Sequence, residues 1–261
     1  MSGVEYGPSR RQARVRMKKI AAVTFDLWDT LIQENPGGSA RVAGIRAERI
    51  GSILSSRGLM HTEDEILAAH EKTGQFLQLV WIKRRDMAVR DQVLFMLSSI
   101  DGRLAGKLTE QDLRDVEKAY TESLLDNPPR LLPGAKDALK DVRGKGYRLG
   151  LISNTGRTPG STLRILMDRM GILGDFDVTT FSNEIMIRKP AEGAFKVTLE
   201  RLRVVPKAAV HIGDDPESDV LGAKRAGMRA IQIVQSGGPM ASQADRHADS
   251  LAGISELIER L

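Results

Sequence analysis

Asp26 follows an almost entirely apolar run of strand length, residues 20–25, and Thr30 lies four positions further on. Short runs rich in β-branched residues are typical of buried strands in parallel sheets, and ligands bind at the carboxyl edge of such sheets. A carboxylate fixed at that edge is a candidate nucleophile or metal ligand. For this segment alone, an ordinary aspartate that caps the following turn is an equally simple interpretation.

Polar residues of complementary chemistry follow other expected strands. Ser153 and Asn154 come directly after the strand expected at residues 147–152, and Lys189 precedes another helix of the same half of the chain. Taken singly, Ser153 is an ordinary helix cap and Lys189 an ordinary surface lysine. At one sheet edge, a hydroxyl and an ammonium together can bind the oxygens of a phosphoryl group.

Three more carboxylates, Asp214, Asp215 and Asp219, follow the strand expected at residues 209–212. Each could be a simple turn former, but carboxylates that are crowded at one edge repel each other unless a cation neutralises them. Oxygen ligands of this kind favour Mg²⁺. The joint pattern predicts a phosphoryl-transfer site that uses Mg²⁺.

The elements that must position these residues can be predicted from periodicity. Four amphipathic helical stripes with short connections, within residues 35–128, indicate an inserted all-α module. After Pro133, strands and helices alternate, which predicts an α/β fold, a doubly wound parallel five-stranded sheet. The expected strands are 20–25, 147–152, 177–181, 209–212 and 229–234, and the expected helices are 134–143, 160–170, 192–203, 219–226 and 254–261. The predicted parts are a basic tail, 1–19, a Rossmann-like core domain, 20–34 and 129–261, and the inserted all-α module, 35–128.

Composition narrows the classes of function. The 261 residues include no cysteine, which excludes disulfides, thiolate catalysis and cysteine-ligated metals. The tail carries six basic residues and only Glu5, so it accounts for the whole net charge of +5 and the body is formally neutral. A nucleic-acid partner is therefore disfavoured. No secretory signal and no apolar run of about 18 residues is visible, so we expect a cytoplasmic protein without membrane contact. The oligomeric state stays open, a homodimer included.

Four motifs in this order and spacing resemble the haloacid dehalogenase superfamily, over roughly residue 20 to the C-terminus. They are Phe-Asp-Leu-Trp-Asp-Thr-Leu, Leu-Ile-Ser-Asn-Thr, Arg-Lys-Pro and His-Ile-Gly-Asp-Asp-Pro-Glu-Ser-Asp. The resemblance implies a hydrolase that acts on a small phosphorylated compound through an aspartyl-phosphate, beneath an α-helical cap that shapes substrate choice. The implied catalytic residues are Asp26, Thr30, Ser153, Asn154 and Lys189. The implied Mg²⁺ shell contains Asp26, the backbone carbonyl of Trp28, Asp214, Asp219 and Asp215.

Trp28 departs from the pattern of the phosphatases in that superfamily, which usually carry a second aspartate there as the general acid and base. Asp29 is adjacent, but neighbouring residues that leave a strand point in different directions. Loss of a positioned acid typically costs ~10²–10⁴ in rate. Leaving groups of low pKa, such as acyl or aryl phosphates, are therefore the expected substrates, unless Asp29 replaces the missing acid.

Two alternatives stay open. A 2-haloacid dehalogenase also carries an aromatic residue at the position of Trp28, and a halide needs no proton, but its chemistry uses no metal and is poorly served by so many carboxylates. The second alternative is a binding or regulatory protein of low turnover. Cap residues that could bind anionic substrate groups are Arg41, Arg46, Lys83, Arg84 and Arg85, although such charges usually form solvated helix faces.

Overall fold

The computed structural model describes residues 19–235 and 237–261, and the predicted basic tail lies outside these ranges except for Lys19. A parallel sheet of six strands forms its centre, in the order β5-β4-β1-β6-β7-β8. The strands are β1 (Ala22–Phe25), β4 (Arg148–Ser153), β5 (Val178–Phe181), β6 (Ala209–Gly213), β7 (Arg229–Ile233) and β8 (Arg246–Ala248). The predicted α/β class is confirmed.

The predicted number of five strands is wrong by one edge strand. β8 pairs with β7 through Ile231 and Arg246, and it contains only three residues, of which two are Arg246 and His247. Such a short polar segment carries none of the apolar pattern of the buried strands, so periodicity could not reveal it.

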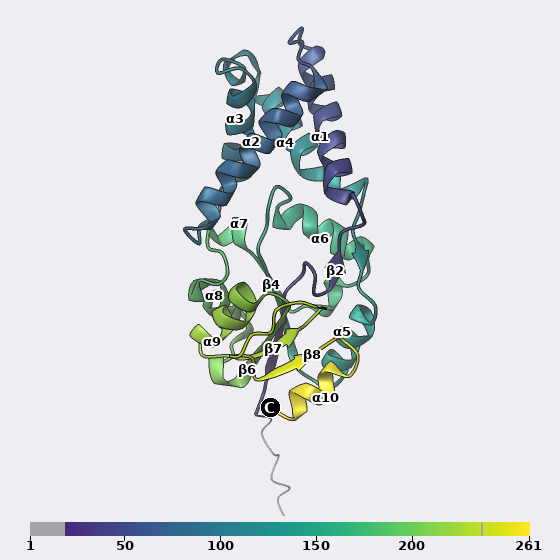
Figure 1. Cartoon of the computed structure of the whole chain (residues 1–261), viewed down its shortest axis with the longest axis vertical. Coiled ribbons are helices and arrows are strands. Elements are labelled where there is room, and N and C mark those ends of the chain that lie inside the picture. The colour runs from purple at the N-terminus through teal and green to yellow at the C-terminus, as the bar shows by residue number, and fades with distance from the viewer. Residues whose placement is uncertain (1–18, 236) are drawn as a thin grey trace, which may run out of the picture.

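Helices cover both faces of the sheet, as Figure 1 shows. They are α5 (Ala135–Gly144), α6 (Gly160–Arg169), α7 (Ser182–Ile185), α8 (Glu192–Leu202), α9 (Gly222–Arg225) and α10 (Ile254–Glu259), with 3₁₀ turns at Leu173–Asp175 and Pro206–Ala208. The helix predicted at 219–226 is instead a π-helical turn, Pro216–Leu221, followed by α9. The turn is wide because the Asp215 carbonyl accepts hydrogen bonds from the amides of both Asp219 (3.0 Å) and Val220 (3.2 Å).

Four longer helices form a separate module at one end of the molecule (Figure 1). They are α1 (Gly38–Ser55), α2 (Glu63–Trp81), α3 (Val89–Ile100) and α4 (Glu110–Glu122), with 3₁₀ turns at Ala105–Lys107 and Ser123–Leu125. Their buried side chains, among them Ile50, Met96 and Tyr120, form a hydrophobic cluster of their own. Capping boxes at Thr62 and Thr109 begin α2 and α4. We call residues 38–125 the helical module.

The chain enters and leaves the helical module through a two-stranded antiparallel ribbon. Strand β2 (Ile32–Gln33) pairs with β3 (Arg130–Leu131), so the segment that enters the helical module and the segment that leaves it lie side by side. Because β2 follows β1 by only six residues, the helical module lies above the carboxyl edge of the sheet (Figure 1). Among the described residues, no helix is long and apolar enough to cross a membrane.

Candidate active site

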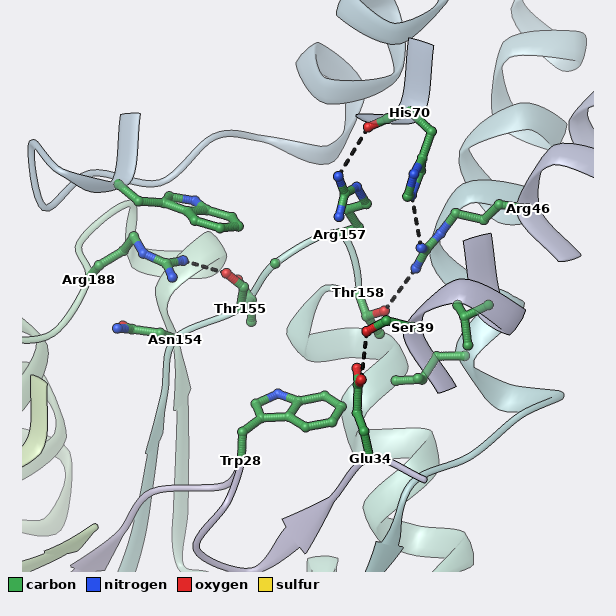
Figure 2. Close-up of a pocket in the computed structure, with 14 residues that line it drawn as sticks. Trp28, Glu34, Ser39, Arg46, His70, Asn154, Thr155, Arg157, Thr158 and Arg188 are labelled. Carbon is green, nitrogen blue, oxygen red and sulfur yellow. Dashed lines mark hydrogen bonds between the residues drawn. The ribbon is translucent and has the colours of Figure 1, made fainter. Parts of the chain in front are cut away.

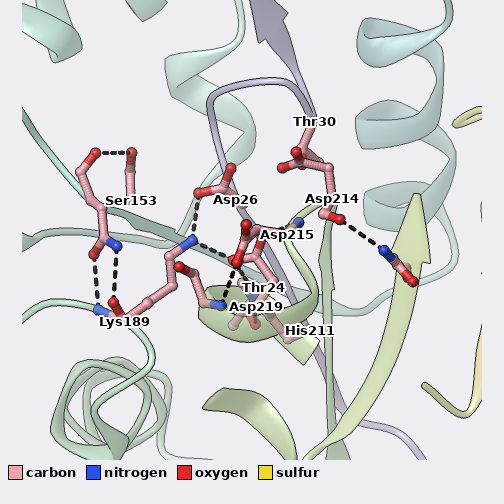
Figure 3. Close-up of polar contacts among 12 residues, drawn as sticks. Thr24, Asp26, Thr30, Ser153, Lys189, His211, Asp214, Asp215 and Asp219 are labelled. Carbon is pink, nitrogen blue, oxygen red and sulfur yellow. Dashed lines mark hydrogen bonds and ion pairs between the residues drawn. The ribbon is translucent and has the colours of Figure 1, made fainter. Parts of the chain in front are cut away.

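Asp26 lies directly beyond β1, where the backbone is still tied to the sheet. Its amide donates to the carbonyl of Ile212 on β6 at 2.9 Å, which fixes the residue between the two central strands. The residue is 7% exposed, and Oδ1 accepts a hydrogen bond from Lys189 Nζ at 2.5 Å (Figure 3). No donor among the described residues is bonded to Oδ2. One oxygen of a buried carboxylate is thus held by an ammonium, and the other is available.

Lys189 is the centre of the polar contacts. Its buried Nζ also donates to Asp219 Oδ1 at 2.6 Å, so one ammonium is shared by two carboxylates. The side chain of Asn154 fixes the Lys189 backbone, because it accepts from the amide at 2.9 Å and donates to the carbonyl at 3.1 Å. Burial opposes the charge of Lys189, but Asp219 and Asp26 outweigh it and raise its pKa. Lys189 is therefore charged at neutral pH.

A buried chain of hydrogen bonds, which was not predicted from the sequence, supports the Lys189 ammonium through Asp219. His211 Nε2 lies 3.1 Å from Asp219 Oδ1, and His211 Nδ1 lies 2.8 Å from Thr24 Oγ1. Burial lowers the pKa of His211, so we assign the neutral ring, which donates from Nε2 and accepts at Nδ1. Thr24 and His211 are directly paired in the register of β1 and β6. A polar residue at matching positions of two otherwise apolar strands was the signal that could have revealed the pair.

Asp26, Asp214 and Asp219 form an acidic cluster in which one ligand atom from each lies within 4.8 Å of the others. Burial raises the pKa of Asp26 to about 8; Lys189 opposes this rise, and the nearby carboxylates of Asp219 and Asp214 add to it. Burial and Asp219 raise the pKa of Asp214 to about 6. Burial and neighbouring carboxylates thus favour the protonated forms of Asp26 and Asp214, and a divalent cation would favour their charged forms instead. Hard oxygen donors in this number fit Mg²⁺.

Other predicted ligands have distinct surroundings. Asp214 is oriented by Thr30, whose hydroxyl donates to Oδ1 at 3.3 Å. Asp219 Oδ2 accepts from the Asp215 amide at 3.0 Å, so both of its oxygens are already bound by the chain. The backbone of Gly213 passes so close that a Cβ there would lie 2.3 Å from the Asp219 carboxyl carbon. Asp219 is therefore a rigid support for Lys189.

Asp215 lies outside the acidic cluster. Its side chain is exposed, and Oδ1 caps the following π-helical turn by accepting from the amides of Glu217 (3.0 Å) and Ser218 (2.5 Å). The structure therefore gives the Asp215 carboxylate a capping contact, in place of the metal contact expected from the sequence.

Trp28 lines the cavity between the sheet edge and the helical module, and Ser153 is the last residue of β4. Hydrogen bonds beside Trp28, from Ile32 to Leu27 (3.0 Å) and from Asp29 to Ile32 (2.7 Å), use the neighbouring backbone groups, so the Trp28 carbonyl stays a candidate ligand. The buried Ser153 hydroxyl makes only a long contact of 3.4 Å with the Asn154 carbonyl, which leaves it able to bind a phosphoryl oxygen.

Comparisons with known proteins find both a matching family and similar folds. A family model for haloacid dehalogenase-like hydrolases matches residues 20–227. A glyceraldehyde 3-phosphate phosphatase of Methanothermobacter thermautotrophicus is 38% identical over 104 residues, which are 40% of this chain and 45% of that relative. The crystal structure of a HAD phosphatase from Thermococcus onnurineus is 26% identical and has a TM-score of 0.61, with 92% of this chain and 98% of that chain covered.

A 2-haloacid dehalogenase from Pseudomonas syringae pv. Tomato DC3000 is similar in fold. Its crystal structure has a TM-score of 0.67 and 23% identity, and the alignment covers 92% of this chain and 99% of that chain. Similarity at this level extends to the fold alone.

Proposed function

Because the chain belongs to the haloacid dehalogenase-like hydrolases, we propose that it is a Mg²⁺-dependent phosphatase that acts through an aspartyl-phosphate on Asp26. The observation that carries this proposal is the pairing of Asp26 with the buried ammonium of Lys189, beside a second carboxylate, Asp214. A nucleophile, a cation for phosphoryl oxygens and a metal ligand thus meet at one sheet edge.

The donor set defines the proposed metal site. Asp26, Asp214 and the backbone carbonyl of Trp28 would hold Mg²⁺, while Thr30 orients Asp214 and Asp219 stays engaged with Lys189. When bound, Mg²⁺ would supply positive charge to the carboxylates and to the oxygens of the phosphoryl group. The raised pKa values of Asp26 and Asp214 support this, because burial disfavours their charged forms and a bound cation would stabilise them.

The residues of the chain perform two displacements in this proposal. An oxygen of Asp26 forms a bond to phosphorus while the bond from phosphorus to the leaving oxygen breaks, and that oxygen keeps the electron pair. Ser153 and Lys189 bind the phosphoryl oxygens and hold them in line. Water then attacks the same phosphorus while the bond from phosphorus to the Asp26 oxygen breaks; the water protons leave with inorganic phosphate or pass to solvent, and the Asp26 carboxylate is restored. Trp28 can supply no proton, so leaving groups that are stable as anions react best.

We also propose that the helical module acts as a cap and that the cavity beneath it receives the rest of the substrate. Trp28 and Asn154 line that cavity from the sheet edge, and residues of α1 and α2 line it from above. Its volume of about 340 Å³ suits a small molecule.

A panel of phenyl, acyl and alkyl phosphates together with 2-haloacids, assayed with Mg²⁺ and with a chelator, tests the proposal. We expect release of phosphate from phenyl and acyl phosphates with Mg²⁺ alone. Halide release that persists in the chelator would favour the dehalogenase, whose fold is similar. A weak rate of phosphate release that is the same with Mg²⁺ and with a chelator would favour the second alternative, a binding or regulatory protein of low turnover.

A further inference from the structure

The cavity beneath the helical module is lined by an excess of cationic side chains. Its walls contain Arg46, Arg157 and Arg188, against one carboxylate, Glu34, which is exposed and accepts from Ser39 Oγ at 2.6 Å. Of the five basic cap residues that the sequence suggested, only Arg46 lines this cavity. Figure 2 shows the arginines above Trp28, on the side toward α1 and α2. The three arginines differ in how their charges are compensated.

Arg46 is a buried cation without a carboxylate partner. It is 6% exposed, and its guanidinium donates to the Tyr120 carbonyl (2.5 Å), to Thr158 (3.4 Å) and to His70 Nε2 (3.3 Å), all of them neutral acceptors. Within the described residues it forms no ion pair. Charged groups are rarely buried in this way unless a counter-charge compensates them.

Arg157 lies beside Arg46 and is also without a carboxylate partner in the described part of the chain. Its Nη2 donates to the His70 carbonyl at 3.1 Å, whereas its buried Nε–H has no partner there. Helix α2 makes room for it, because a Cβ at Gly74 would lie 2.2 Å from Arg157 Nη2. The helix therefore accommodates a guanidinium that it leaves partly unsatisfied.

Arg188 and Trp81 also line the cavity and differ in whether their donors have partners. Arg188 is compensated, because it donates to Asp86 at 3.0 Å and stacks 4.3 Å from the Trp81 ring. The indole N–H of Trp81 is the second buried donor in the described chain that lacks a partner. Both unsatisfied donors thus belong to the walls of one cavity, in which a buried polar group without a partner calls for a ligand.

We propose that this cavity binds a second anionic group of the substrate, a carboxylate or a phosphate, through Arg46 and Arg157. The inference rests on the proposed phosphatase function, because the phosphoryl group that reacts is placed at Asp26. An anion in the cavity would compensate two guanidinium groups and accept the free N–H of Arg157. The substrate class is therefore a phosphate ester or acyl phosphate that carries a further anion.

Three aryl phosphates test this inference: 4-carboxyphenyl, 4-carbamoylphenyl and 4-phosphonooxyphenyl phosphate. They differ only in the substituent para to the phosphate ester. The carbamoyl compound is the neutral counterpart of the carboxylate. Calorimetric Kd values are measured with Mg²⁺ on Asp26→Asn, so that binding is separated from turnover, and kcat/KM is measured on the wild type. We expect at least one of the two compounds with a second anionic group to bind ~10–100-fold more tightly than the carbamoyl compound, as charged hydrogen bonds predict. The tighter of the two identifies the second anion.

Variants in the Asp26→Asn background locate the effect. Arg157→Gln removes the cation, and Gly74→Ala displaces it without deleting it, so both should bring the ratio of Kd values toward one. Lys72→Gln, which removes an exposed charge from the same helix α2, should leave the ratio unchanged. Thermal unfolding checks that each variant is folded. If Arg157→Gln does not fold, Gly74→Ala still tests the role of Arg157.

The outcomes separate the two proposals. Equal Kd values for all three compounds would overturn the second-anion site, whether or not the wild type hydrolyses them. A preference for the anions that survives both Arg157→Gln and Gly74→Ala would also overturn it. Selective binding without any hydrolysis by the wild type would support the anion site and remove the phosphatase function.

Discussion

Trp28 and Asp29 are neighbours in the chain but face different cavities. Trp28 lines the cavity beneath the helical module, whereas Asp29 lines a second one, of about 290 Å³, with Asp214 and Gln235. The positive φ of 57° at Asp29 turns the chain between them, and Gln235 fixes the turn by donating to the Asp29 carbonyl at 3.0 Å. Asp29 therefore does not share the proposed substrate cavity.

This divergence predicts that no residue replaces the missing acid. Across substituted aryl phosphates, log kcat/KM should fall steeply as the pKa of the leaving group rises, because the chain protonates nothing. Trp28→Asp should flatten the slope and raise activity on alkyl phosphates, by up to ~10²-fold. Asp29→Asn is the matched control and should leave the slope unchanged. A flat slope in the wild type that steepens in Asp29→Asn would make Asp29 the acid.

Asp214 and Asp215 are adjacent carboxylates with different surroundings, and this permits a matched test of the metal site. Asp214→Asn should weaken Mg²⁺ binding by at least ~10-fold in titration calorimetry, because it removes an anionic ligand. Asp215→Ala should instead leave Mg²⁺ affinity unchanged and lower the free energy of unfolding by about 1 kcal/mol, because it removes a helix cap. Equal Mg²⁺ affinity in Asp214→Asn and the wild type would remove Asp214 from the site.

Asp86 connects the helical module to the rest of the chain. It lies in the loop between α2 and α3, is 4% exposed, and accepts from Thr155 (3.2 Å), Ser182 (2.5 Å) and Arg188 (3.0 Å). Asp86→Ala should lower the free energy of unfolding by about 3–5 kcal/mol, because it leaves Arg188 buried and unpaired.

Denaturant unfolding and amide hydrogen exchange at residues 82–88 and 182–188 would measure this loss. The control is Asp91→Ala, an exposed position on α3, where we expect a change within about 0.5 kcal/mol. Similar stability and exchange in Asp86→Ala and Asp91→Ala would show that the contact contributes little.

His70 predicts how stability depends on pH. Burial and the nearby Arg157 and Arg46 lower its pKa from 6.5 to about 3, so the folded protein keeps a neutral ring that accepts from Arg46. Between pH 6.5 and 3 the unfolded chain binds a proton here that the folded chain does not, so stability falls as pH falls.

His70→Gln keeps an acceptor for Arg46 but does not titrate. Between pH 6 and 4, the unfolding free energy of the wild type should therefore drop by up to about 1.4 kcal/mol per pH unit more than that of the variant. Denaturant midpoints at several pH values measure both slopes. Parallel slopes would mean that His70 takes up a proton equally in both states.

The site could be predicted from the sequence where strand order alone decides proximity. Asp26 and Asp214 each follow a strand of one parallel sheet and Ser153 ends another, so their shared edge follows from the topology. His211 could not be recognised, because its role depends on the register with Thr24. The role of Arg157 could not be predicted either, because its contacts with His70 and Gly74 form only when α2 packs over the sheet edge.

The phosphorylated form of Asp26 is the most direct test of the account. Wild-type protein is mixed with Mg²⁺ and a fast aryl phosphate, quenched in acid within the first turnover, and digested for mass spectrometry. We expect one phosphoryl group on the peptide that contains Asp26, none in Asp26→Asn, and none with a chelator. Turnover that proceeds without any phosphorylated Asp26, or a phosphoryl group on another residue, would contradict the covalent mechanism.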